Sequence, residues 1–234
     1  MKKIYSLLLL TFASASFGQT VITAWDFDTS ALTPTTGAGT ITLIGGVVEN
    51  TQSGCTCSFV GGNPSTGKAY TTKTYPAQGA DSGTAGIQFA VSTVGQTSIN
   101  VYVDVYGSNT ASKYVQLQYT TNGTTWVDAG TPTIVPYTTS SQWVTLSQAM
   151  PVAAENNANF AFRVVSVFDP TTGGTSYSPI NSTSTYAAGG ALRYDNAKVS
   201  NGALGLDRNA ISGLKIYPNP VSHGTLFIEN CCEC

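Results

Sequence analysis

This sequence contains little charge and almost no histidine. Asp, Glu, Lys and Arg make up only 9% of its 234 residues, whereas about 25% is usual in soluble domains. The single histidine, His223, lies in the closing segment, which excludes histidine-based catalytic triads and histidine zinc sites from the body of the chain. No segment shows convincing helical periodicity. The chain does not resemble a disordered protein either, because 12 Tyr, 9 Phe and 3 Trp supply large apolar side chains.

The N-terminus has the three parts of a secretory signal peptide. Lys2 and Lys3 precede an apolar run from Ile4 to Phe12, and small residues follow that run. We predict that residues 1–19 form the signal, with cleavage near Gly18–Gln19. The apolar run is shorter than the about 20 residues of a membrane span. No second long apolar run follows, so we expect no transmembrane segment after cleavage.

Loss of the two N-terminal lysines changes the charge balance of the chain. It leaves eight basic residues against 12 acidic ones, a net charge of about −4. The remaining basic residues form no stripe, and nucleic acid is therefore not an expected partner.

Residues 20–201 alternate apolar and polar positions in the manner of β-strands. Ile99, Val101, Val103 and Val105 share one face of a strand by this pattern. The dipeptide Asn122-Gly123 predicts a hairpin turn between strands Gln116–Thr121 and Thr124–Ala129. Further strands are predicted at Val21–Phe27, Thr40–Val48, Gly86–Val91, Gln142–Ser147, Asn159–Phe168 and Leu192–Val199. These strands predict an all-β fold, a two-sheet jelly-roll-like β-sandwich.

Three other segments of the body depart from this strand pattern. The runs at 59–84 and 169–190 are rich in Gly, Ser, Thr and Pro, and we interpret them as surface loops, where binding function often lies. The segment "PVAAENNANF" is the best candidate for a short turn of helix.

Acidic side chains occur near both ends of the body. Asp26 and Asp28 alternate in "AWDFD", and Asp195 and Asn196 follow one another near the end of the last predicted strand. The first and last strands of a jelly roll often lie close together, so these oxygens are candidate ligands for a calcium ion. The alternative is an exposed polar strand face and a turn. A glycosidase carboxylate pair remains a further alternative, because the spacing permits it.

Aromatic side chains are the candidates for binding a ligand. Tyr102 and Tyr106 lie on the more polar face of their predicted strand, Trp126 follows the hairpin turn, and Tyr177 and Tyr186 fall in a loop. Exposed aromatic rings stack on sugar rings beside groups that bind hydroxyls. The alternative is that the three tryptophans fill the core and the tyrosines cover the surface of the sheets.

Cys55 and Cys57 stand one residue apart in "GCTCS". A disulfide between positions i and i+2 is strained, so each thiol pairs elsewhere or stays free. Export would place both in an oxidising compartment, and their pairing is left open.

The closing segment "LKIYPNPVSHGTLFIEN" consists of two apolar runs around a Pro-Asn-Pro turn, and it follows a short polar linker at 202–212. It resembles the start of the C-terminal sorting domain of the Bacteroidetes type IX secretion system. The residues that carry the resemblance are Leu214, Ile216, Tyr217, Pro218, Asn219, Pro220, Gly224, Leu226 and Ile228. Sorting domains of this family continue through further strands, whereas "CCEC" follows here. Residues 213–234 are thus interpreted as the truncated start of such a domain.

The resemblance implies recognition by the type IX secretion machinery and a secreted or outer-surface location. More loosely, "AWDFD", "VQLQYTTNGTTWVDAG" and "FAFRVVSVFDP…LRYDNAKVSNG" resemble jelly-roll modules of cell-surface adhesins and polysaccharide-degrading systems. The expectation is an exported, non-catalytic module for adhesion or carbohydrate binding, with a glycan or surface polysaccharide as partner. A polysaccharide-active enzyme that uses Asp26, Asp28 or Asp195 is one alternative, and a structural surface or matrix protein is another.

Overall fold

The computed structural model describes residues 19–51, 58–202, 214–217 and 227–230. The chain divides into two compact units, Met1–Ala203 and Leu204–Cys234. The described part of the first unit is built from strands and two short 3-10 helices, η1 (Val152–Ala154) and η2 (Pro170–Thr172). No helix among the described residues is long and apolar enough to cross a membrane.

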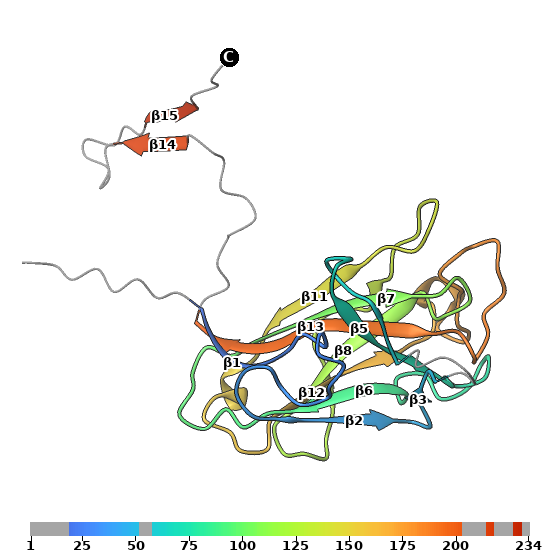
Figure 1. The fold of residues 1–234 in the computed structure, drawn as a ribbon, viewed down its shortest axis with the longest axis horizontal. Coiled ribbons are helices and arrows are strands. Elements are labelled where there is room, and N and C mark those ends of the chain that lie inside the picture. The colour runs from blue at the N-terminus through green and yellow to red at the C-terminus, as the bar shows by residue number, and fades with distance from the viewer. Residues whose placement is uncertain (1–18, 52–57, 203–213, 218–226, 231–234) are drawn as a thin grey trace, which may run out of the picture. The chain divides into compact units, whose positions relative to one another are not determined.

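The first unit is a β-sandwich of two antiparallel sheets (Figure 1). The seven-stranded sheet has the order β11-β7-β13-β5-β3, with β1 paired to β13 and β4 paired to β5. Its strands are β1 (Thr20–Trp25), β3 (Val48–Glu49), β4 (Phe59–Gly61), β5 (Lys68–Lys73), β7 (Asn100–Gly107), β11 (Val144–Ala149) and β13 (Leu192–Asn201).

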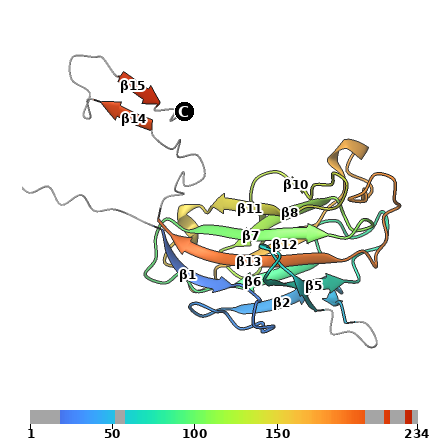
Figure 2. The same ribbon diagram turned by 45° about the horizontal axis from the view of Figure 1, so that its top comes forward.

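The six-stranded sheet has the order β10-β8-β12-β6-β2, with β9 paired to β8. Its strands are β2 (Thr40–Ile44), β6 (Gly86–Ala90), β8 (Tyr114–Thr120), β9 (Val127–Asp128), β10 (Thr133–Ile134) and β12 (Ala161–Ser166). Figure 2 shows the two layers, with β7 and β13 side by side in one and β6 and β12 in the other. The predicted two-sheet, jelly-roll-like class is confirmed.

The core lies between the inner faces of the two sheets. The apolar positions of β7 predicted to share a face are all buried, with Val101, Val103 and Val105 at 0% exposure. From the other sheet, Phe89 and Phe162 stack at 4.7 Å between ring centroids, and Trp25 of the first sheet lies 5.2 Å from Phe89. Each buried large side chain of this kind stabilises the fold by about 1.5–3 kcal/mol relative to exposure.

The interpretation of 59–84 as a surface loop was wrong in its middle. This segment contains β5, which pairs with β13, β3 and β4. Three consecutive residues of β5, Tyr70, Thr71 and Thr72, are at most 2% exposed. The Thr72 hydroxyl donates to the Leu192 carbonyl oxygen (3.2 Å). This buried polar side chain therefore has its hydrogen-bond partner within the sheet.

The Asn122-Gly123 hairpin is present, with a longer loop than predicted. Tyr119 pairs with Val127, so the connection runs from β8 to β9 through several unpaired residues. Gly123 has φ of 79°, the left-handed conformation that glycine adopts without strain. The Asn122 side-chain oxygen accepts hydrogen bonds from the backbone of Thr124 (2.9 Å) and Thr125 (2.8 Å). The loop therefore has a fixed internal structure, and Trp126 stands at its end.

In the second unit, β14 (Leu214–Tyr217) and β15 (Phe227–Asn230) form an antiparallel pair. Leu214 pairs with Asn230, Ile216 with Ile228 and Tyr217 with Phe227. The two strands agree with the predicted pair of apolar runs. Pro218, Asn219, Pro220, Gly224 and Leu226 lie outside the described residues, as do Cys55, Cys57 and the signal segment up to residue 18.

Candidate functional site

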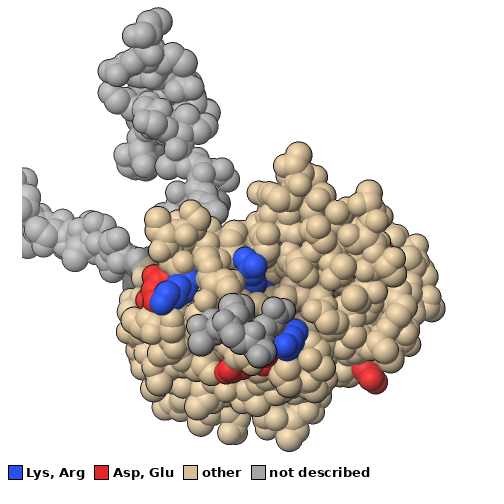
Figure 3. Space-filling model, turned by 45° about the vertical axis from the view of Figure 1, so that its right-hand side comes forward, with Lys and Arg blue, Asp and Glu red and all other residues tan. Residues whose placement is uncertain are grey.

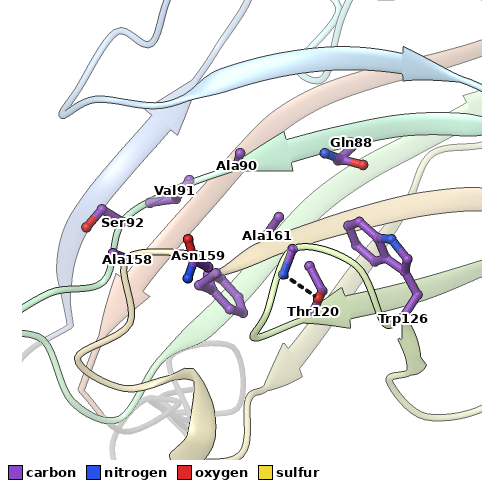
Figure 4. Close-up of a pocket in the computed structure, with 11 residues that line it drawn as sticks. Gln88, Ala90, Val91, Ser92, Thr120, Trp126, Ala158, Asn159 and Ala161 are labelled. Atoms are coloured by element: carbon purple, nitrogen blue, oxygen red, sulfur yellow. Dashed lines mark hydrogen bonds between the residues drawn. The ribbon is translucent and has the colours of Figure 1, made fainter.

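A depression of about 300 Å³ lies on the outer face of the six-stranded sheet (Figure 4). Its floor consists of small side chains on adjacent strands, because Ala161 of β12 pairs with Ala90 of β6 and with Thr120 of β8. Larger residues stand around this floor. The lining residues are Gln88, Ala90, Val91, Ser92, Thr120, Gly123, Trp126, Ala158, Asn159, Phe160 and Ala161.

Trp126 forms a wall of the depression and is held in place by its neighbours. The Arg163 guanidinium carbon lies 4.1 Å from the centroid of the indole ring, a distance at which a cation and a ring attract one another. Arg163 Nε donates to Gln118 Oε1 (2.7 Å), and Gln118 Nε2 donates to Asp128 Oδ1 (2.7 Å). This row of side chains crosses β12, β8 and β9 and holds the guanidinium in position on the ring.

Burial lowers the pKa of Arg163, while the charge of Asp128 opposes this effect. The guanidinium nevertheless keeps its charge near neutral pH, because an arginine side chain is not deprotonated in proteins. The charge that attracts the ring is therefore retained, and the indole of Trp126 presents an apolar surface beside the depression.

The polar groups around the floor are neutral amides and hydroxyls. Within the described part of the chain, the side-chain amides of Gln88 and Asn159 have no hydrogen-bond partner, although each has two donors and an acceptor. Asn157 ties the walls together, because its Nδ2 donates to the Thr121 carbonyl oxygen (2.9 Å) and its Oδ1 accepts from the Asn159 backbone (2.8 Å). These hydrogen bonds fix the backbone that carries Asn159, while Gln88 is carried by β6.

The composition of this site decides what chemistry it can perform. None of the lining residues is an acid, a histidine or a cysteine. General acid–base catalysis needs such groups within reach of the substrate, and the hydroxyls of Ser92 and Thr120 have no base among the lining residues to activate them as nucleophiles. The arrangement of an indole wall, an alanine floor and free amides instead suits reversible binding of a flat, hydroxylated molecule.

The structure separates the predicted aromatic ligand residues into three groups. Trp126 lies at the depression. Tyr102 and Tyr106 belong to β7 and lie on the outer face of the seven-stranded sheet, the opposite side of the sandwich. They therefore do not act together with Trp126 on one small ligand.

The third group consists of Tyr177 and Tyr186. The prediction that they are exposed ligand-binding residues of a surface loop at 169–190 was wrong, because both are buried. Tyr177 is 2% exposed and Tyr186 is 8% exposed. Their rings stack on each other at 4.6 Å, and Phe168 meets Tyr177 edge to face at 4.7 Å. Their hydroxyls donate to the carbonyl oxygens of Ala80 (3.0 Å) and Pro76 (2.7 Å). Burial raises the pKa of both phenols. The rings form a small core beneath the loop and are not available to stack on a sugar.

The predicted strand geometry of Asp26 and Asp28 was wrong. β1 ends at Trp25, and Phe27 adopts φ of 55° so that its ring enters the core. The chain turns there, and the Asp28 backbone donates to Asp26 Oδ1 (3.2 Å). Asp28 Oδ1 in turn accepts from the Lys68 backbone (2.7 Å), which fixes the start of β5.

Asp195 is buried at 2% exposure beneath the segment that contains Gly62 and Asn63. Its two oxygens accept hydrogen bonds from the backbone of Asn63 and of Asn196, both at 2.7 Å. A Cβ atom at Gly62 would collide with Asp195 Oδ2, so the absence of a side chain there permits the contact. Burial raises the pKa of Asp195 to about 6, and the nearby charges of Asp104 and Asp28 act in the same direction.

The sequence interpretation missed Asp104 and Asn63, which complete this cluster. Asp104 Oδ2 accepts from the side-chain amides of Asn63 (2.9 Å) and Asn196 (2.9 Å), and Asp104 Oδ1 accepts from the Thr145 hydroxyl (2.5 Å). The first strand, β1, pairs with the last strand, β13, which carries Asp195 and Asn196. Asp28, which follows the end of β1, lies near enough to act electrostatically on Asp195. Yet the described residues contain no group of three or more His, Cys, Asp or Glu side chains placed to hold a metal ion. In this arrangement the carboxylates hold loops together through hydrogen bonds, and the calcium site stays a prediction.

No protein-family model matches the chain, and no curated protein matches it. Several solved structures are similar at low identity. The CBM22-1 xylan-binding domain of Paenibacillus barcinonensis Xyn10C matches with a TM-score of 0.44 and 12% identity, covering 82% of this chain and 100% of that one. The tandem CBM22 domain of the same protein matches with a TM-score of 0.44 and 13% identity over 87% of this chain, which spans about half (51%) of the tandem.

Domain 4 of AbnA, a GH43 arabinanase of Geobacillus stearothermophilus in complex with arabinotriose, matches with a TM-score of 0.43 and 14% identity. The match covers 80% of this chain and 95% of that one. These likenesses are too distant to carry a ligand or an activity over to this chain.

Proposed function

We propose that residues 20–201 form a non-catalytic carbohydrate-binding module whose site is the depression beside Trp126. The observation that carries the proposal is the combination of an indole wall, a floor of Ala90 and Ala161, and the free amides of Gln88 and Asn159. A sugar ring has an apolar C–H face, which can pack on the indole, and a rim of hydroxyls, which can form hydrogen bonds with the amides. Because the lining groups carry no charge, the ligand class is a neutral saccharide.

The test is binding of the protein from Gln19 onward to a panel of neutral polysaccharides, with xylan and arabinan included, by affinity electrophoresis and calorimetry. Trp126→Ala should weaken binding at least about tenfold, as expected for removal of an aromatic residue at the centre of a binding site. Trp143→Ala is the matched control, since Trp143 is also half-buried but precedes β11 on the other sheet. Equal losses in both variants, or no binding by the folded protein to any neutral glycan, would refute the assignment.

We also propose that the chain is exported through the signal segment and that β14 and β15 begin a type IX sorting domain. Support comes from the motif residues of the closing segment and from the antiparallel pairing of Leu214–Tyr217 with Phe227–Asn230. The test is fractionation of cells that produce the full chain or a version ending at Asn201. Sorting predicts that only the full chain, or a chain extended by the genomic reading frame past Asn230, reaches the surface or the medium. Equal export of the version ending at Asn201 would reject this role.

A further inference from the structure

The outer face of the seven-stranded sheet carries two pairs of a cation and an aromatic ring. Arg193 lies over the ring of Tyr106 at 4.9 Å, and Lys198 lies over the ring of Tyr102 at 4.5 Å. Both rings project from β7, and both cations come from the adjacent strand β13, at positions that pair directly with the tyrosines. The register between β7 and β13 therefore places each cation opposite its ring.

The two pairs are set a fixed distance apart. Tyr102 and Tyr106 are four residues apart on one strand, which corresponds to about 13 Å along the sheet. Trp143 lies beside Tyr106 on the side of β11, with its ring centroid 5.4 Å from that of the tyrosine. Between the pairs, Asn63 lies against Asp104 and Asp195, to which it donates hydrogen bonds. A molecule that contacts both pairs must therefore be long enough to cross this segment, whereas a small ion can contact only one pair.

Asp104 lies between the two pairs on β7, but its oxygens are already used. They accept hydrogen bonds from the side chains of Thr145, Asn63 and Asn196. Neither Arg193 nor Lys198 donates a hydrogen bond to another residue of the described part of the chain. Each cation is thus oriented by a ring and keeps its N–H donors for a molecule that binds from outside.

Charged side chains are scarce on this protein, and Figure 3 shows them as small groups on an otherwise uncharged surface. Two oriented cations on one sheet face are therefore a distinctive feature. We propose that this face binds a polysaccharide that carries carboxylate groups, with one carboxylate at Arg193 and another at Lys198. Arginine and lysine both bind carboxylates through charge-assisted hydrogen bonds, and the rings of Tyr106 and Trp143 offer apolar contact to the sugar next to Arg193. A nucleic acid is a poor match, because two cations would neutralise few of its closely spaced phosphates.

The test uses polygalacturonate as the acidic probe and its fully methyl-esterified form as the neutral one, with the protein from Gln19 to Cys234. The wild-type protein should bind polygalacturonate, with affinity that falls as salt rises, and should bind the ester at least tenfold more weakly. The double variant Arg193→Gln, Lys198→Gln should lose at least tenfold in affinity for polygalacturonate. Lys113→Gln is the matched control, because Lys113 also lies over a ring, that of Tyr114, but directly precedes β8 of the other sheet.

Three results would overturn this inference. They are equal binding of the acidic polymer and its ester, unchanged affinity in the double variant, and the absence of binding by the folded wild-type protein. Binding of a single-stranded oligonucleotide as tight as that of polygalacturonate would also reject the saccharide. Trp126→Ala should leave polygalacturonate binding unchanged, so failure of this inference and failure of the neutral-saccharide site are separate outcomes.

Discussion

The two outer faces of the sandwich are built from the same kinds of residue but present different surfaces. On the six-stranded sheet, Ala90 and Ala161 leave a depression beside Trp126, and the cation Arg163 lies against the indole ring. On the seven-stranded sheet, Asp104 and its amide partners fill the centre between the two cation–ring pairs. The difference shows that small outward side chains leave a depression on one face, whereas Asp104 and the amides hydrogen-bonded to it occupy the space between the aromatic residues on the other.

Filling the depression on the six-stranded sheet should have the largest effect on saccharide binding and should make the two faces more alike. Ala90→Phe places a large side chain on the floor, beside Gln88 and Ala161, and removes the space that a sugar ring would occupy. We expect binding of neutral saccharides to be lost, while the melting temperature changes little because Ala90 points away from the core. Calorimetry measures the first and thermal unfolding the second. Retention of full affinity in a folded Ala90→Phe protein would contradict the assignment of the floor.

Removal of the free amides should have a smaller effect. Gln88→Ala and Asn159→Ala each delete one set of neutral hydrogen bonds, worth about 0.5–1.5 kcal/mol. We therefore expect the dissociation constant for a neutral oligosaccharide to rise about threefold to tenfold in each variant. Gln96→Ala is a suitable control, since Gln96 is an amide on the same unit that does not line the depression. A loss in the control equal to that in Gln88→Ala would argue against direct contact.

The contact between Arg163 and Trp126 should contribute less again. A cation over an exposed ring is worth about 0.5–1 kcal/mol, so Arg163→Gln should weaken saccharide binding about twofold to fivefold. Arg163→Lys keeps the charge but loses the Nε donor to Gln118, and it should recover part of the loss. Quenching of tryptophan fluorescence by acrylamide reports the added mobility of Trp126. If quenching and affinity both stayed unchanged in Arg163→Gln, Arg163 would have no role in positioning the indole.

The acidic cluster on the seven-stranded sheet predicts that stability depends on pH. The pKa of Asp195 in the folded protein is raised to about 6, against about 3.9 in an unfolded chain. The unfolded chain therefore loses its proton first as pH rises, and the free energy of unfolding should fall between about pH 4 and pH 6. Urea unfolding in the presence of a chelator measures this trend, and Asp195→Asn should flatten it. Added calcium should reverse the fall if the ion binds at this cluster; an unchanged pH profile and melting temperature with calcium would remove the calcium prediction.

Much of the fold was predictable because the pattern of apolar residues is strong where one strand face meets the core. The alternation from Ile99 to Val105 predicted β7, and all four residues are buried. The pattern failed at β5, where Thr71 and Thr72 are buried inside a sheet, and at Tyr177 and Tyr186, where a polar segment folds over its own small core. In both places burial depends on partners distant in the sequence, and local composition does not report them.

The candidate site was predictable only in part. Trp126 was found because it follows an Asn-Gly turn, which is a local signal. Ala90 and Ala161 have no chemical signature, and their meeting depends on the register of β6 against β12. The amides of Gln88 and Asn159 become a site only when that register is known. In the acidic cluster, Asp195 and Asn196 were predicted but Asp104 was not. Asp104 reaches the cluster only through the pairing of β7 with β13, which the sequence does not show.

The most direct test of the account is a titration of the isotope-labelled protein with a neutral oligosaccharide, followed by amide chemical shifts. The account predicts that the shifts that move belong to the end of β6, the start of β12 and the loop between β8 and β9, around Ala90, Ala161 and Trp126. Movement confined to β7 and β13, or to the buried tyrosines Tyr177 and Tyr186, would contradict it.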